Sequence, residues 1–106
     1  MDLFVEKIFR WGIIGPGKIA HKFSQSLPFS KNGKLVSVAS TSLDRSLGFS
    51  QLYGAEYAFG SYEEMLKSGT IDAVYIATPH SFHFDNAALA ISAVSVLPQG
   101  VLEILL

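Results

Sequence analysis

The feature that most constrains the fold of this 106-residue chain is a glycine-rich turn directly after a short apolar run. The run, residues 8–15, is mostly apolar, as expected for a strand buried on both faces of a parallel sheet. From Lys18 to Leu27 apolar residues recur at helical spacing, and Pro28 ends the pattern. We therefore predict a strand, a tight turn and a helix, joined by Gly15-Pro16-Gly17-Lys18-Ile19-Ala20.

The rest of the chain repeats this alternation of strand and helix. Hydrophobic and β-branched residues between turn signals predict further strands at 35–40, 56–59 and 72–77. Helices are predicted at 43–53, between an N-cap at Ser42 and Gly54, and over two turns from the capping-box pair Ser61 and Glu64 to Gly69. The order predicts an α/β fold, a Rossmann-like parallel sheet with flanking helices, which binds ligands beyond the carboxyl ends of its strands.

The glycine turn has the spacing Gly-x-Gly-x-x-Ala/Gly, for which two interpretations exist. In a dinucleotide site, Gly15 permits the tight turn, Gly17 lets a pyrophosphate approach the backbone, and Ala20 allows close packing of helix on strand. Alternatively, the glycines simply join a strand to a helix. The position at the first strand–helix junction favours the dinucleotide interpretation. We assign cofactor binding to Gly15, Pro16, Gly17, Lys18, Ile19 and Ala20.

The residues after the second strand bear on the choice between NAD and NADP. An acidic residue there would bind the ribose diol and repel a 2′-phosphate, but the chain has Ser40-Thr41-Ser42, with Arg45 one helical turn further on. Ser40 and Thr41 are therefore predicted to contact the cofactor, and NADP is favoured over NAD. Asp44 is a competing ribose ligand, although an acid in the first turn of a helix simply complements the helix dipole, which we prefer.

Thr78-Pro79-His80-Ser81-Phe82-His83 follow the fourth strand, where the reactive end of such a cofactor would lie. We predict that Thr78, Pro79, His80 and His83 contact the nicotinamide half or substrate; a capping or hydrogen-bonding role for one histidine is the alternative. A metal site with Asp85 falls short of the usual three or four ligands, so none is predicted. His21 is predicted to be a solvated helix residue.

The composition narrows the choice of partners and compartment. A net charge of -1, with eight scattered Lys and Arg residues, gives no basic patch, so we expect neither nucleic acid nor membrane as a partner. The chain contains no Cys, which excludes a disulfide framework and a Cys nucleophile. Its first residues lack the basic and apolar segments of a signal peptide. We therefore expect a cytoplasmic protein.

The chain divides at about residue 86. Residues 1–86 are predicted to form a NAD(P)-binding Rossmann-like domain. Residues 87–106 form an apolar tail whose only charge is Glu103, and Pro98-Gln99-Gly100 interrupts any membrane span. The tail belongs to the same domain or is foreign sequence, and an interaction surface is a further alternative for it.

Three segments, 10–20, 57–66 and 72–83, resemble the N-terminal domain of the glucose-fructose oxidoreductase and inositol dehydrogenase family (Gfo/Idh/MocA). The resemblance covers about residues 8–86. It implies that the glycine turn binds the pyrophosphate, and that Thr78, Pro79 and His83 lie near the nicotinamide ribose. It also implies NADP-dependent hydride transfer to or from a sugar or dihydrodiol.

Residues 87–106 depart from this family, and the chain has no Lys or Arg after Lys67. Family members continue into a fifth strand ending in Glu-Lys-Pro, whose lysine assists proton transfer, and then into a substrate-binding domain. Both are absent here, so the fold is expected to be truncated. Two functions follow: the dinucleotide-binding N-terminal part of an oxidoreductase, or a catalytically inactive nucleotide-binding or vestigial domain.

Overall fold

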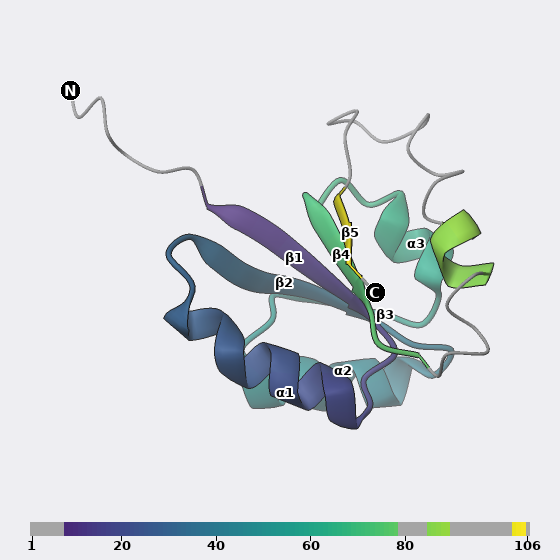
Figure 1. The fold of residues 1–106 in the computed structure, drawn as a ribbon. Coiled ribbons are helices and arrows are strands. Elements are labelled where there is room, and N and C mark those ends of the chain that lie inside the picture. Colours follow the sequence, from purple (N-terminus) through teal and green to yellow (C-terminus); the bar gives the residue numbers. More distant parts are fainter. Residues whose placement is uncertain (1–7, 79–84, 90–102, 106) are drawn as a thin grey trace.

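The computed structural model describes residues 8–78, 85–89 and 103–105. They form a five-stranded sheet in the order β3-β2-β1-β4-β5, and every pairing is parallel (Figure 1). The strands are β1 (Phe9–Ile14), β2 (Gly33–Ala39), β3 (Tyr57–Phe59), β4 (Ala73–Ile76) and β5 (Glu103–Leu105). The chain moves outward from β1 to β2 and β3, then returns to the other side of β1 for β4. The predicted Rossmann-like sheet is confirmed, and β1 and β4 flank the point where its strand order reverses.

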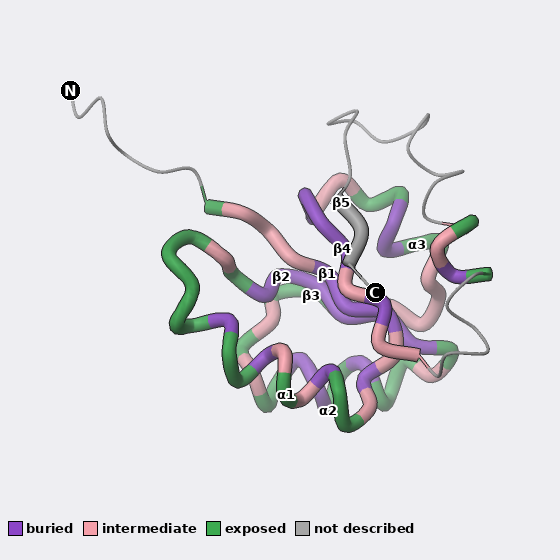
Figure 2. Tube along the Cα trace, in the orientation of Figure 1, coloured by how far each residue is buried: buried purple, intermediate pink, exposed green. Residues whose placement is uncertain are grey.

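Helices cover both faces of the sheet. On one face lie α1 (Lys18–Ser26), the short 3₁₀ helix η1 (Leu27–Phe29) and α2 (Leu43–Tyr53), and on the other α3 (Tyr62–Leu66) and helical residues 85–89 (Figure 1). Figure 2 shows the most deeply buried residues in β2, β4 and the second half of β1. The buried core on the α1 and α2 face contains Ile13, Ala20, Leu27, Leu35, Val38 and Phe49. The core on the α3 face contains Ile14, Ala39, Met65, Leu66, Ile71, Val74 and Ile76.

The predicted helix ends agree with the structure in α2 and at the start of α3. Ser42 caps α2 by accepting a hydrogen bond from the Arg45 backbone N–H at 3.4 Å, and Gly54 ends the helix with φ +74°. Ser61 accepts the equivalent bond from Glu64 N–H. However, α3 ends at Leu66 and not near Gly69. The Ser68 hydroxyl donates to the Met65 carbonyl oxygen at 2.6 Å, which satisfies that group without another helical turn.

Strand β2 contains one residue more than its partner β1. Trp11 pairs with Leu35 and Gly12 with Ser37, so Val36 is an extra, bulged residue. In a regular strand, residues three apart point to opposite faces, but here Leu35 and Val38 belong to the same core. The bulge thus reverses the alternation of side chains halfway along β2.

The structure also describes a strand that the sequence did not predict. Glu103–Leu105 form β5, which pairs in parallel with Ala73–Tyr75 of β4. Because β4 has β1 on only one side, its other edge offers unpaired backbone groups that a short apolar segment can satisfy. Within the described ranges, no helix has the length and apolar character needed to cross a membrane.

Candidate functional site

The glycine turn lies between the end of β1 and the start of α1. Gly15 has φ +89°, its backbone N–H donates to the Ala39 carbonyl oxygen at 3.0 Å, and Gly17 N–H donates back to the Gly15 carbonyl oxygen at 2.9 Å. An ideal Cβ built on Gly15 would lie 2.8 Å from Thr78 Cγ2, closer than any side chain tolerates. Both the positive φ and this contact require glycine, and they hold the turn against the end of β4.

Gly17 shows the opposite surroundings. It is the N-cap of α1, no described side chain caps the helix there, and a Cβ built on it would meet nothing within 4 Å. The first helical hydrogen bond runs from His21 N–H to the Gly17 carbonyl oxygen at 3.1 Å, so the preceding backbone N–H groups, of Lys18, Ile19 and Ala20, have no helical partner. Uncapped N–H groups beside open space fit an anion such as a pyrophosphate.

The two hydroxyls predicted after β2 have different surroundings. Ser40 is only 2% exposed, and its Oγ accepts a hydrogen bond from Ser42 N–H at 3.1 Å. Its own N–H donates to the Phe59 carbonyl oxygen at 3.2 Å. Ser40 therefore shapes the loop, whereas the exposed Thr41 presents its side chain at the surface. Asp44 and Arg45 are also exposed, in the first turn of α2.

Thr78 lies immediately beyond β4, and its hydroxyl is held by a residue that sequence reasoning missed. Thr78 Oγ1 donates to Asn86 Oδ1 at 2.5 Å, and Asn86, in helical residues 85–89, is 8% exposed. In the sequence, its only signal is a polar residue directly before the apolar Ala87-Ala88-Leu89. The other predicted residues of this segment, Pro79, His80 and His83, lie outside the described residues.

The prediction for His21 was wrong. Its Nδ1 lies 2.6 Å from the Tyr53 hydroxyl, and its ring centre lies 4.8 Å from that of Phe49. Because α1 and α2 lie side by side on one face of the sheet (Figure 1), a side chain of α1 can pack against α2, as His21 does. His21 is thus a half-buried packing residue between two helices.

No metal centre is found in the parts of the chain that the structure describes, where no group of three or more His, Asp or Glu side chains could hold an ion. His80 and His83 are not among those residues.

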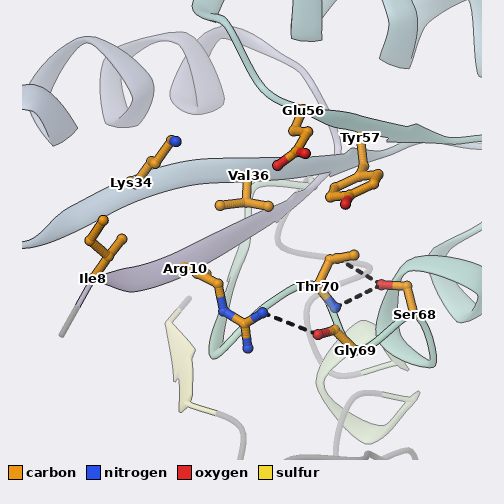
Figure 3. Close-up of a pocket in the computed structure, with 9 residues that line it drawn as sticks. All are labelled: Ile8, Arg10, Lys34, Val36, Glu56, Tyr57, Ser68, Gly69 and Thr70. Atoms are coloured by element: carbon orange, nitrogen blue, oxygen red, sulfur yellow. Dashed lines mark hydrogen bonds between the residues drawn. The ribbon is translucent and has the colours of Figure 1, made fainter.

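A hollow of about 430 Å³ lies at the opposite, amino-terminal edge of the sheet (Figure 3). Arg10 is one of the residues that line it, and its side chain is held in place by three contacts: Nη2 lies 3.0 Å from Asp72 Oδ1, Nε donates to Oδ2 at 3.1 Å, and Nη1 donates to the Gly69 carbonyl oxygen at 3.2 Å. The hydrogen bond and negative charge of Asp72 raise the pKa of Arg10 above its usual value. The lining residues are Ile8, Arg10, Lys34, Val36, Glu56, Tyr57, Ser68, Gly69 and Thr70.

The hydroxyl groups of this hollow are already engaged with one another. Ser68 donates its hydrogen to Met65, so it must accept from Thr70 Oγ1, 2.7 Å away. The single hydrogen of Thr70 is then used, and Ser37, also 2.7 Å from Thr70 Oγ1, must be a donor. Together with the Arg10–Asp72 pair, this chain of hydrogen bonds makes the hollow a structural junction between β1, β2 and the loop before β4.

Comparison with known proteins identifies the family of this chain. A family model described as "Oxidoreductase family, NAD-binding Rossmann fold" matches residues 9–96. The trans-1,2-dihydrobenzene-1,2-diol dehydrogenase of Mus musculus is 39% identical over 87% of this chain and 29% of that enzyme. The D-xylose 1-dehydrogenase (NADP(+)) of Hypocrea jecorina is 36% identical over 79% of this chain and 25% of that enzyme.

Solved structures show the same fold. A variant of a 3-ketoreductase from Actinomadura kijaniata, in complex with TDP-benzene and NADP, aligns with a TM-score of 0.76 and 25% identity over 92% of this chain and 28% of that one. Scyllo-inositol dehydrogenase from Lactobacillus casei, with bound NAD(H) and scyllo-inositol, gives a TM-score of 0.73 at 22% identity over 92% of this chain and 27% of that one. The chain thus spans less than a third of the proteins it matches.

Proposed function

The chain belongs to the oxidoreductase family with an NAD-binding Rossmann fold, and from this premise we propose that it binds NADP through its glycine turn. It would supply the cofactor-binding part of an enzyme that transfers hydride to or from a sugar or dihydrodiol. The main support is the open space at Gly17, in front of an α1 terminus that no described side chain caps. The pyrophosphate would occupy that space and accept hydrogen bonds from the first backbone N–H groups of α1.

The preference for NADP over NAD rests on side chains near the end of β2. Thr41 and Arg45 are both exposed, so both are free to approach a 2′-phosphate. The position that would hold a ribose-binding acid is Ser40, which is buried and bonded to Ser42. Asp44 lies in the first turn of α2, where its charge is favourable without any ligand.

The proposed substrate class comes from the relatives, whose names include a dihydrodiol dehydrogenase and a D-xylose dehydrogenase. Bound NADP supplies the hydride acceptor of such a reaction. The described residues of this chain would bind and orient the dinucleotide across the carboxyl ends of β1, β2 and β4. Turnover also needs a held substrate carbon and a group that moves the alcohol proton.

A second candidate is a dinucleotide-binding domain without catalytic activity. The relatives described above extend well beyond the 25% to 29% that this chain spans, so binding and turnover are tested separately on these residues. For either candidate we propose a cytoplasmic location, which suits a chain without Cys.

The test is a titration of the purified chain with NADPH, followed by nucleotide fluorescence. Gly17→Val should abolish binding, because the added side chain occupies the pyrophosphate space. Gly48→Val is the matched control: a Cβ at Gly48 also meets nothing within 4 Å, but this residue lies in the middle of α2. Equal affinity of the Gly17→Val variant and the unmodified chain would contradict the proposal.

The same preparation separates the two candidate functions. It is incubated with NADP and either D-xylose or trans-1,2-dihydrobenzene-1,2-diol, and NADPH formation is followed by absorbance. We expect binding without turnover from these 106 residues alone. Steady turnover would exclude the inactive candidate.

A further inference from the structure

We propose that Asn86 is a positioning residue, which holds the Thr78 hydroxyl as a hydrogen-bond acceptor for the nicotinamide half of a bound dinucleotide. The inference rests on the proposed function, because it concerns the same site. It begins from the hydrogen bond between the Thr78 and Asn86 side chains.

A threonine hydroxyl carries one hydrogen and two lone pairs. In this structure the hydrogen of Thr78 Oγ1 is donated to Asn86 Oδ1, at a distance of 2.5 Å between the two oxygens. Toward any other group, Thr78 Oγ1 can then only accept. A ligand at this position must therefore present an N–H or O–H group.

Asn86 is well placed to hold that orientation. Asn86 is only 8% exposed, and its neighbours Ala87 and Leu89 pack against the core on the α3 face. The burial of Asn86 and the packing of its neighbours therefore restrict the movement of the acceptor oxygen. A hydroxyl without such a partner would rotate freely and offer either a hydrogen or a lone pair.

The position of Thr78 identifies the half of the cofactor that meets it. Thr78 touches the glycine turn at Gly15 from the β4 side of β1, whereas Thr41 follows β2 on the other side. A dinucleotide lies across this crevice with its pyrophosphate at the turn, so its two halves extend to opposite sides. With the 2′-phosphate half near Thr41, the nicotinamide half falls to Thr78.

The chemistry of that half matches an acceptor. The nicotinamide ribose has two hydroxyl groups and the carboxamide has an N–H₂ group, all of which can donate. Phosphate oxygens, in contrast, only accept at neutral pH. Asn86 thus makes Thr78 selective for the ribose or carboxamide and against a misplaced phosphate.

The experiment compares NADPH with 2′,5′-ADP, which carries the phosphorylated adenosine and no nicotinamide. Thr78→Val and Asn86→Leu are each expected to weaken NADPH binding about tenfold, the effect of one hydrogen bond, with 2′,5′-ADP binding unchanged. Thr78→Ser and Asn86→Asp keep the hydroxyl and the acceptor oxygen, and should retain NADPH affinity. Melting temperatures identify any variant that fails to fold. If Asn86→Leu is one of them, a loss of NADPH affinity in Thr78→Val and a retained affinity in Asn86→Asp still test whether the hydroxyl and its acceptor matter.

The double variant tests whether Asn86 acts through Thr78. If it does, Asn86→Leu causes no further loss of affinity in a Thr78→Val background. Additive losses, or an equal loss of 2′,5′-ADP affinity, would overturn the positioning role. If the unmodified chain binds 2′,5′-ADP and NADPH equally, the turn binds nucleotide but the nicotinamide contact is wrong; if it binds neither, the proposed function fails as well.

Discussion

The methyl group of Thr78 occupies the space in which a side chain on Gly15 would begin. An ideal Cβ on Gly15 would lie 2.8 Å from Thr78 Cγ2 and 3.2 Å from the Thr78 backbone nitrogen. Part of this contact is backbone, so rotation of the Thr78 side chain would relieve only the other part. The glycine turn and the end of β4 are therefore in close contact, with no room for a side chain at Gly15.

Gly15→Ala should destabilise the fold by about 2 kcal/mol or more, because it adds both an unfavourable positive φ and a steric clash. Gly17→Ala is the matched control, since Gly17 has φ -97° and open space beside it. Chemical denaturation measures both variants. Equal free energies of unfolding for the two would contradict the tight contact between Gly15 and Thr78.

Arg45→Gln should weaken NADPH binding by about fivefold, the effect of losing one exposed charge-assisted contact, and leave NADH binding unchanged. Lys34→Gln removes a positive charge at the opposite edge of the sheet and serves as the control. Titrations with both cofactors give the comparison. A preference of the unmodified chain for NADH would show that the choice of NADP is wrong.

Asp72→Asn should lower the free energy of unfolding by about 1–2 kcal/mol, because the Asp72 carboxylate accepts three hydrogen bonds from Arg10. The loss is limited because the Arg10 side chain is 36% exposed, and solvent weakens its attraction to Asp72. Lys67→Met, which removes an exposed ion pair with Glu63, should have a smaller effect in the same denaturation experiment. The reverse order would argue against a structural role for the Arg10–Asp72 pair.

The pKa of Glu63 should lie below its usual value, because Lys67 donates a hydrogen bond to its carboxylate and adds a nearby positive charge. A lowered pKa in the folded state means that the pair stabilises the protein above the pKa of unfolded Glu63. That contribution is lost as the pH falls through the folded value. NMR titration of the Glu63 carboxyl carbon should show a normal pKa in Lys67→Met. If the pKa in this variant is as low as in the unmodified chain, the ion pair with Lys67 is not the cause.

The periodic and turn-forming parts of the fold were predictable from the sequence. Helix α2, for example, has a hydroxyl cap at Ser42 and a glycine with positive φ at Gly54, both local signals. The glycine turn was predictable for the same reason, since the positive φ of Gly15 is a property of the turn itself. These features depend on residues close together in the chain.

The features that were missed depend on tertiary contacts. Glu103–Leu105 form a strand only because the edge of β4 is available, and three residues carry no periodicity of their own. Asn86 joins the site through a partner eight positions away. His21 looked solvated because the chain does not reveal which face of α1 meets Phe49 and Tyr53.

Val36 divides β2 into two parts whose lengths can vary independently during evolution. A relative lacking one residue at this bulge would still pair Ser37–Ala39 with Gly12–Ile14, and so would keep Thr41 in place. Leu35 would then adjoin Ser37 and still pair with Trp11, so the deletion removes the bulge and leaves both parts of β2 in register. A one-residue deletion in β2 among relatives should therefore fall at Val36, whereas the spacing from Ser37 to Thr41 should be constant.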